Sequence, residues 1–385
     1  MSPGRRHRKT ISSPGSSERR TRNRHADRAE VSREVSSLRV ARRKGTLMTK
    51  QTSALRFSVL DTAPIVQGSN ASQALRECVE LAQFVDGLGY HRFWIPEHHG
   101  MRGVASAAPA VVIDRVASLT HHMRVGAGGV MTPNHSPIVI AEQFGTLEAF
   151  HPARIDLGLG RALGGPREVT DRIRSPHDRA ATPFEDQIRE LLELFDEQSE
   201  DRAAAVPAEG NRPEIWLLGS SDYTARVAGA LGLPFAAAHH LQPHNTIAAT
   251  HVYRQAFEPS TLCPAPRTMI SVAVIAAETD ERAQWLSGPL RMKTARRQEG
   301  QPIRLPSPQT AEHYGYATRR AAADELDGVF IGSPSSVLAR LQDLAEATRA
   351  DEFLIKTDLY RPSDRGESFK LLADAFLALR HRQTP

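Results

Sequence analysis

The sequence predicts an α/β protein of the (β/α)8 TIM-type barrel class, with an insertion after the seventh strand. Two observations carry this prediction. From residue 56 to near the C-terminus, short runs rich in β-branched and aromatic residues alternate with amphipathic helical patterns, and eight such runs can be counted. The glycine fingerprint that follows the first strand of a doubly wound dinucleotide-binding sheet is missing. We therefore expect a closed barrel and not an open sheet.

The first strand and helix show the pattern clearly. Residues 56–60 (RFSVL) read as a strand, and a turn-rich loop follows them. Asn70 or Ser72 can cap a helix over residues 73–88, in which apolar residues recur at helical spacing. Gly89 then ends this helix, because glycine adopts the left-handed conformation that a helix C-terminus often needs.

The other elements are predicted by the same criteria. Further strands are expected at residues 91–95, 123–131, 154–159, 214–218, 234–238, 268–276 and 352–357. Further helices are expected at residues 108–120, 137–150, 184–195, 222–231, 244–257, 280–297, 334–347 and 363–379. The insertion, residues 299–328, is polar and holds several prolines. Loops of this length usually act as lids or lack fixed structure, and both alternatives stay open here.

The positive charge of the chain is concentrated at its N-terminus. Of the 49 Lys and Arg and 44 Asp and Glu, residues 1–46 hold 14 and 4, so the remainder has 35 basic against 40 acidic residues. Residues 1–47 are therefore expected to be a disordered basic tail or the result of a misassigned start, with Met48 opening a barrel domain over 48–385. An arginine-rich arm for nucleic acid is an alternative that the acidic body does not favour.

The cysteines and the hydropathy bear on location. Cys78 and Cys263 show neither metal-ligand spacing nor a disulfide framework, which fits a reducing cytoplasm. No apolar run approaches the roughly 20 residues that a membrane-spanning helix needs. We expect a cytoplasmic protein without a membrane role.

Three polar residues directly follow the second predicted strand. In a barrel of this class the active site lies at the C-terminal ends of the strands, which is where Glu97, His98 and His99 stand. A neutral imidazole can move protons near neutral pH, and an adjacent carboxylate can fix its tautomer. A structural histidine is the alternative. No third metal ligand can be placed, so we predict no metal.

Glycines interrupt the third predicted strand. Residues 126–129 read Gly-Ala-Gly-Gly inside an apolar run, and such glycines mark a bulge or the close approach of a ligand to the backbone. Gly128 and Gly129 are therefore candidates to lie against a flat ring system. A bulge that serves only the packing of the barrel is the alternative.

A phosphate site is predicted at the ends of the next two strands. Arg161 follows the fourth strand, and Gly219, Ser220 and Ser221 follow the fifth, at the start of a helix. An arginine fork, two hydroxyl groups and the free N–H groups of a helix N-terminus can bind a phosphate together.

These segments, in this order, resemble the bacterial luciferase-like flavin monooxygenases. The resemblance is carried by GYHRFWIPEHHG (89–100), VGAGGVMTPNHSPIVIAEQFGTLEAFHPARIDLGLGRALG (125–164) and PEIWLLGSSDYTARVAGALGLPFAAAHH (213–240). It extends to GSPSSVLARLQDL (332–344) and DRGESFKLLAD (364–374), and so covers about residues 55–381. The sequence is similar to the single-chain members of this family and not to the light-emitting α subunit.

The resemblance implies a barrel that oxygenates a small organic substrate with O₂ and reduced FMN, the latter supplied by a separate flavin reductase. By position, His98 matches the family's catalytic histidine, supported by His99 or Glu97. Arg161, Ser220 and Ser221 match its phosphate-binding positions. The bond between Gly128 and Gly129 matches the place where the family often holds a cis peptide against the isoalloxazine.

Some features do not transfer. Gly160 stands where the luciferase α subunit has a reactive cysteine, so light emission is not expected. The same fold family includes hydride-transfer members, so a deazaflavin-dependent oxidoreductase is an alternative. A non-catalytic flavin-binding partner subunit is another, although the presence of both His98 and Arg161 argues against it. The family's tendency to dimerise leaves a homodimer open, and the substrate is not specified.

Overall fold

A computed structural model describes residues 55–196, 204–317 and 326–383 of the chain. The predicted tail, residues 1–47, and the proposed start at Met48 lie outside the described residues. So does the part of the insertion from residue 318 to 325. Within the described ranges, no helix is long and apolar enough to cross a membrane.

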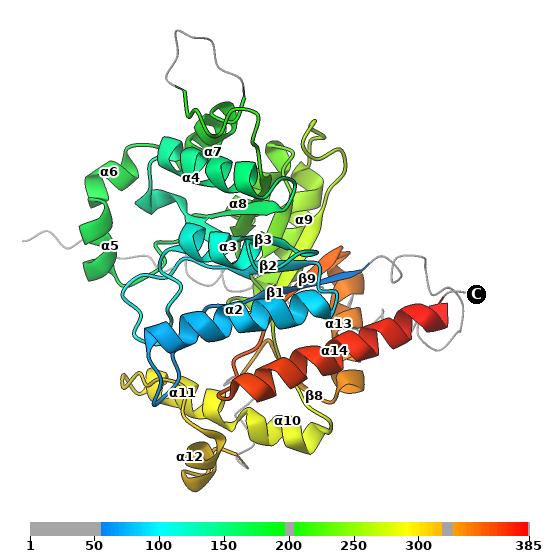
Figure 1. The fold of residues 1–385 in the computed structure, drawn as a ribbon. Coiled ribbons are helices and arrows are strands. Elements are labelled where there is room, and N and C mark those ends of the chain that lie inside the picture. The colour runs from blue at the N-terminus through cyan, green and yellow to red at the C-terminus, as the bar shows by residue number, and fades with distance from the viewer. Residues whose placement is uncertain (1–54, 197–203, 318–325, 384–385) are drawn as a thin grey trace, which may run out of the picture. The chain divides into compact units, whose positions relative to one another are not determined.

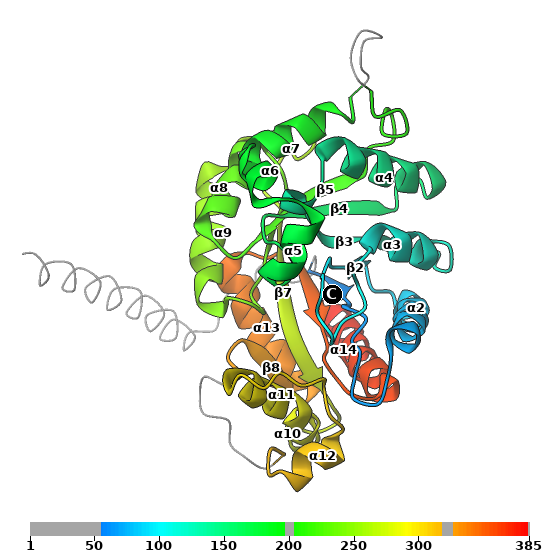
Figure 2. The same ribbon diagram turned by 90° about the vertical axis from the view of Figure 1, so that its left-hand side faces the viewer.

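The described residues form a closed barrel of eight parallel strands with helices around it (Figures 1 and 2). Each strand pairs with the next one along the chain, and the last barrel strand closes the ring by pairing with both the first and the seventh. The barrel strands are β1 (Arg56–Leu60), β2 (Arg92–Ile95), β3 (Arg124–Met131), β4 (Ile155–Gly160), β5 (Glu214–Gly219), β6 (Phe235–Ala237), β7 (Thr268–Ala276) and β9 (Glu352–Lys356). The predicted fold class is confirmed.

Helices connect the strands and cover the outside of the barrel, as Figure 2 shows. The outer ring comprises α2 (Ala71–Gly87), α3 (Pro109–Ala117), α4 (Pro137–Phe150), α7 (Phe184–Glu193), α8 (Asp222–Ala230), α9 (Thr246–Ala256), α13 (Pro334–Thr348) and α14 (Pro362–Gln383). Local signals in the sequence determine where they begin and end. The Asn70 side chain accepts a hydrogen bond from the Gln73 N–H at the start of α2, and Gly89 lies just beyond the end of α2 with a φ of 79°.

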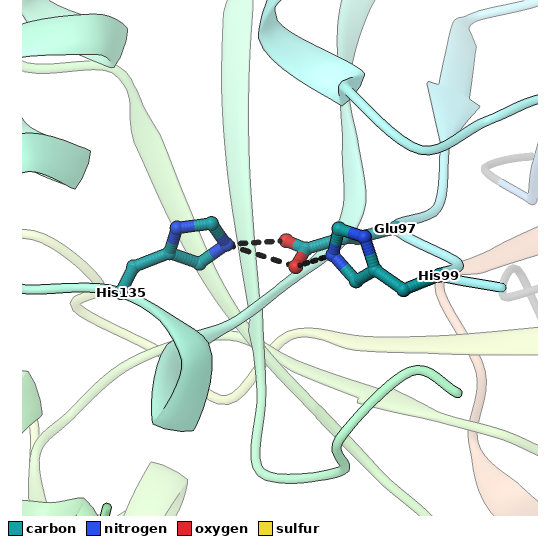
Figure 3. Close-up of side chains that lie close together, drawn as sticks. All are labelled: Glu97, His99 and His135. Atoms are coloured by element: carbon teal, nitrogen blue, oxygen red, sulfur yellow. Dashed lines mark hydrogen bonds and ion pairs between the residues drawn. The ribbon is translucent and has the colours of Figure 1, made fainter. Parts of the chain in front are cut away.

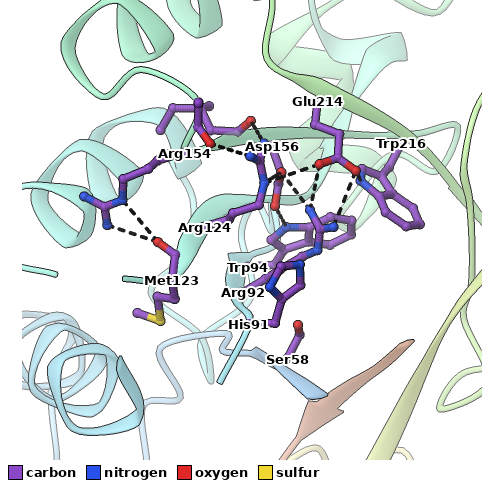
Figure 4. Close-up of polar contacts among 12 residues, drawn as sticks. Ser58, His91, Arg92, Trp94, Met123, Arg124, Arg154, Asp156, Glu214 and Trp216 are labelled. Carbon is purple, nitrogen blue, oxygen red and sulfur yellow. Dashed lines mark hydrogen bonds and ion pairs between the residues drawn. The ribbon is translucent and has the colours of Figure 1, made fainter. Parts of the chain in front are cut away.

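The interior of the barrel has two layers. Inward-facing residues alternate along each strand, and those in the middle form a small apolar cluster: Leu60, Trp94, Trp216, Ala236, Met269 and Leu354. Below them, at the N-terminal ends of the strands, lies a set of charged side chains that we call the basal network, shown in part in Figure 4: Arg92, Arg124, Asp156, Glu214 and Glu352. In barrels of this class the active site lies at the opposite ends of the strands.

Arg92 is the centre of the basal network. Its side chain is 1% exposed and lies 2.9 Å from Asp156, 3.3 Å from Glu214 and 3.0 Å from Glu352. All three carboxylates come from strands that are not neighbours of β2, so the ion pairs cross the barrel interior. Asp156, fully buried, also pairs with Arg124 at 2.6 Å and accepts a bond from the Trp94 indole at 2.8 Å. Every carboxylate oxygen of Asp156 and Glu352 thus faces a donor, as burial requires.

The region between β7 and β9 departs from the prediction. The single helix expected at 280–297 is two helices, α10 (Asp280–Leu286) and α11 (Gly288–Gln298). The break falls before Pro289, because proline has no N–H to donate inside a helix. A short strand that was not predicted, β8 (Val329–Gly332), follows the insertion and pairs with the end of β7. Its four residues are too few to show an alternating pattern.

Two further stretches expected as loops contain helices. The polar segment after β4 forms α5 (Arg167–Ile173) and α6 (Pro176–Ala180), and the insertion forms α12 (Pro308–His313). Residues just before α12 dock on the loops that follow β1 and β2. The Leu305 carbonyl accepts from the Gln67 N–H at 2.8 Å, and Arg304 donates to the carbonyl of Arg102 at 3.2 Å. This placement favours the lid alternative, although a lid role stays a prediction.

Candidate active site at the C-terminal ends of the strands

All predicted site residues lie at one face of the barrel. The strands are parallel, and the candidates follow the C-terminal ends of β2, β4 and β5 or lie near the end of β3. Backbone bonds connect these segments. The Glu97 N–H donates to the Gly129 carbonyl at 3.2 Å, and the His99 N–H donates to the Gly164 carbonyl at 2.8 Å. The barrel therefore brings segments together that are distant in sequence.

A buried carboxylate organises this face. Glu97 is 1% exposed, and its carboxylate lies 2.6 Å from His99 Nε2 and 2.8 Å from His135 Nε2. We call these three residues the Glu97 cluster (Figure 3). The Met131 N–H donates to the same carboxylate at 3.0 Å, and the Asn134 amide donates at 3.4 Å. Burial works to raise the pKa of Glu97, but the hydrogen bonds from His135, His99 and Met131 together lower it below its ordinary value.

His135 was not singled out in the sequence. It lies in the segment TPNHSP, after a short 3₁₀ turn, η2 (Thr132–Asn134), that follows β3. The segment was quoted for its resemblance, but no role was assigned to its histidine. His135 and Glu97 are 38 residues apart and meet only because β2 and β3 are neighbours in the barrel. The third potential metal ligand that the sequence could not place is therefore present beside Glu97 and His99.

His98 lies in the same loop, but it is not among the hydrogen-bond partners of the Glu97 carboxylate. Its backbone N–H donates to the Ser106 carbonyl at 2.9 Å. Its ring Nδ1 is buried and has no hydrogen-bond partner among the described residues. Burial, and then the nearby Lys356 ammonium group, lower the pKa of His98 to about 4. An unpartnered buried nitrogen at this face of the barrel is a feature that a bound molecule can explain.

Lys356 is a candidate site residue that the sequence did not reveal. It is the last residue of β9, at an inward position two residues after Leu354, and it forms an ion pair with Asp358. It also acts on His240, whose Nδ1 lies 2.8 Å from the Ser271 hydroxyl oxygen. Burial first, and then Lys356, lower the pKa of His240 to about 4. Two histidines at this face are thus held neutral near pH 7.

The glycine segment of β3 contains the expected bulge. In the pairing of β3 with β4 the register shifts between Gly128 and Val130, which leaves Gly129 as the extra residue. The peptide bond between Gly128 and Gly129 is cis. A Cβ atom on Gly128 would lie 2.9 Å from Leu60 and 3.1 Å from Trp94. The packing alternative therefore accounts for Gly128, and contact of the bulge with a ring system stays a prediction.

The structure places the predicted phosphate residues around the start of α8. Ser221 is its N-cap, and the Ser221 side chain makes no capping hydrogen bond. The Arg161 guanidinium lies over the ring of Tyr223, in the first turn of α8, at 4.6 Å from the ring centroid. Gly219 lets this turn approach β5 closely, since a Cβ there would be 2.7 Å from Thr224.

These features fit a flavin phosphate. The free N–H groups at the start of α8 and the hydroxyl of Ser221, which makes no capping bond, provide donors. Arg161 is exposed and makes no ion pair within the described residues. A Cβ at Gly160 would meet nothing closer than 3.4 Å, so the backbone beside Arg161 is open. The residues expected to hold FMN could therefore do so in this arrangement.

Comparisons with known proteins identify the family. The model of the luciferase-like monooxygenase family matches residues 55–352, and the chain belongs to this family. A luciferase-like monooxygenase of Escherichia coli K12 is 38% identical over 330 residues, which span 85% of this chain and 98% of that protein. An N-acetyl-S-alkylcysteine monooxygenase of Bacillus subtilis is 31% identical over 333 residues, 84% and 99% of the two chains.

Solved structures agree. The crystal structure of apo-MsnO8 is 36% identical with a TM-score of 0.79, and the match covers 84% of this chain and 98% of that one. Neighbours below 25% identity show the fold alone. They include a 3,6-diketocamphane monooxygenase from Pseudomonas putida in complex with FMN (20% identity, TM-score 0.64, 83% and 97% covered). They also include an F420-dependent secondary alcohol dehydrogenase (13% identity, TM-score 0.59, 84% and 99% covered). Structures with this fold thus include one with FMN and one with an F420 adduct.

Proposed function

We propose that this protein is a flavin-dependent monooxygenase that inserts one atom of O₂ into a small organic substrate, using reduced FMN. The observation that carries the proposal is the pairing of a phosphate cradle with an unpartnered histidine at one end of the barrel. The cradle is Arg161 with Ser220 and Ser221 at the start of α8, and the histidine is His98. Membership of the luciferase-like monooxygenase family supports it.

The phosphate end of the flavin would be held at α8. Backbone N–H groups at a helix N-terminus attract anions, and the hydroxyls of Ser220 and Ser221 can add donors without backbone movement. Arg161 is held near that turn by its contact with Tyr223, so its guanidinium can form a charged hydrogen bond to the phosphate. When bound, reduced FMN supplies the electrons that activate O₂.

His98 is the residue that we expect to handle protons. Its Nδ1 can accept a hydrogen bond from a bound molecule or donate one to it, because it forms no hydrogen bond with any described residue. Glu97 and His99 flank it and hold the loop through bonds to the segments after β3 and β4. In this proposal they are supporting residues, and they position the His98 ring.

We expect reduced FMN to come from another protein. The described residues form one barrel, with no doubly wound unit of the kind that binds a nicotinamide dinucleotide. A separate flavin reductase is therefore the expected partner. The small-molecule substrate is unidentified, and the thioether that the name of the Bacillus subtilis relative implies is a reasonable first probe.

The proposal is tested by oxygen uptake and product analysis under ¹⁸O₂. Purified protein receives reduced FMN from a flavin reductase and a substrate panel that includes N-acetyl-S-alkylcysteines. We expect a product that carries one ¹⁸O atom. His98→Ala should lower its rate by about 10²–10⁴-fold, the usual contribution of a proton-transferring group, while FMN binding persists.

The matched control is His122→Ala, since His122 is exposed and remote from this face. Equal loss in both variants, or full activity of His98→Ala, would remove His98 from the mechanism. Titration with FMN and with the deazaflavin F420 separates the two cofactors. Tight binding of the deazaflavin alone, with hydride transfer that needs no O₂, would overturn the monooxygenase proposal.

A further inference from the structure

The Glu97 cluster has the composition of a metal site. Two imidazole nitrogens and one carboxylate form the ligand set of many zinc sites and of mononuclear iron oxygenases. The ligand atoms of Glu97, His99 and His135 all lie within 4.8 Å of one another. Figure 3 shows the carboxylate between the two rings, with both Nε2 atoms directed at it. We propose that this cluster binds one divalent transition-metal ion of the Zn²⁺ type.

The electrostatics of Glu97 favour a cation there. A carboxylate that is 1% exposed normally has a cationic partner or a metal ion, since burying an isolated charge is costly. Among the described residues, no lysine or arginine forms an ion pair with Glu97, and its charge partners are the two histidines. The basal network differs, because there each buried carboxylate faces an arginine.

The geometry needs little adjustment. The present Nε2–oxygen separations of 2.6 and 2.8 Å are those of hydrogen bonds. Metal–nitrogen and metal–oxygen bonds of about 2.0–2.2 Å in a tetrahedral site separate the ligand atoms by roughly 3.4 Å, so the two pairs have to open by roughly 0.8 and 0.6 Å. The ion would replace the Nε2 protons, which move to Nδ1 or to solvent.

Other features of the cluster suit a metal. The Met131 N–H and the Asn134 amide donate hydrogen bonds to the Glu97 carboxylate, as groups outside the ligand set do in metal sites. His99 and His135 are 18% and 26% exposed, which leaves an entry path for the ion. Three protein ligands leave a coordination position open. The ion would tie the loop that holds His98 to the segment after β3.

The experiment is a Zn²⁺ titration of the full chain after treatment with a chelator and dialysis, followed by calorimetry. We expect one ion per chain at the cluster and a higher Tm with Zn²⁺. His135→Ala should weaken this site at least 100-fold and abolish the shift in Tm. His313→Ala, at an exposed histidine on α12, is the control and should change neither.

Binding that is the same in wild type, His135→Ala and His99→Ala would show attachment to other histidines and overturn the proposal. Absence of a one-to-one site in the wild-type chain would do the same, and this reading needs no variant to fold. Co²⁺ gives an independent readout, since a site with this ligand set has visible absorption bands that His135→Ala should remove. None of these measurements depends on turnover, so they stand apart from the monooxygenase proposal.

Discussion

The two ends of the barrel treat buried charge in different ways. At the N-terminal ends of the strands, Arg92 and Arg124 face carboxylates directly, and Asp156 at their centre is fully buried. At the C-terminal ends, the buried carboxylate of Glu97 faces two partly exposed histidines, and His98 has an unpartnered nitrogen. Arginine keeps its charge at any ordinary pH, whereas an imidazole also has a neutral form that can donate and accept hydrogen bonds.

From this difference we expect the N-terminal end of the barrel to contribute stability and the C-terminal end to bind ligands. The basal network is saturated with donors and acceptors and leaves nothing for a ligand to satisfy. The opposite end keeps donors and acceptors available in the Glu97 cluster, at His98 and at the start of α8. In barrels of this class the C-terminal end is where catalysis occurs, and the N-terminal end contributes to stability. The predictions below test this division, from the largest expected effect to the smallest.

Arg92→Met should lower the free energy of unfolding by about 3–5 kcal/mol, because it leaves Asp156 and Glu352 buried without their cation. Urea denaturation monitored by circular dichroism measures it. Lys370→Met is the control, since Lys370 forms an exposed pair with Asp374, and the free energy of unfolding should hardly change. A cost below 1 kcal/mol for Arg92→Met would mean that the basal network does not stabilise the barrel.

Arg161→Ala should weaken FMN binding by about 1.5–3 kcal/mol, the usual contribution of a charged hydrogen bond, and leave the free energy of unfolding unchanged. Fluorescence titration with FMN measures the affinity. Arg189→Ala, at an exposed arginine on α7, should have no effect. Unaltered FMN affinity in Arg161→Ala would place the phosphate elsewhere.

Acidification should destabilise the C-terminal end through His240. Its folded-state pKa of about 4 lies below the ordinary histidine value, so the unfolded chain takes up a proton between pH 6.5 and 4 that the folded chain does not. Stability is therefore lost as the pH falls through this window, by about 2 kcal/mol from this group at pH 5.

His240→Gln should remove that share of the pH dependence. The measurement is the free energy of unfolding of wild type and variant at pH 7.5 and pH 5. The difference between the two proteins isolates His240 from other histidines. An identical pH dependence of the free energy of unfolding in both proteins would show that folding does not lower the pKa of His240.

Asn134→Ala should have the smallest effect, a loss of about 1 kcal/mol in the free energy of unfolding. The Asn134 amide donates to the Leu163 carbonyl at 2.9 Å and to Glu97 at 3.4 Å, and solvent can replace it at Leu163, which is partly exposed. Thermal denaturation checks it. A loss above 3 kcal/mol would mean that hydrogen bonds at this face stabilise the fold as much as the ion pairs of the basal network do.

Much of the fold was predictable because its signals are local. Asn70, Gly89 and the glycines of β3 determine their own neighbourhoods through capping, left-handed backbone and bulge formation, and each acts within a few residues. The same holds for the strand ends that carry Glu97, Arg161 and Ser221. β8 and the short helices α5 and α6 were missed, because segments of four to seven residues are too short for a periodic pattern.

The site was only half predictable for the same reason. Residues that follow a strand can be assigned to the C-terminal face from order alone, which made His98 and the residues at the start of α8 candidates. The partnership of Glu97 with His135 and the approach of Lys356 to His98 depend on which strands are neighbours and how the ring closes. The amino-acid order thus determined the barrel and its functional end. The tertiary structure alone decided which charges meet there, because contacts between distant residues arise from strand pairing and leave no trace in local periodicity.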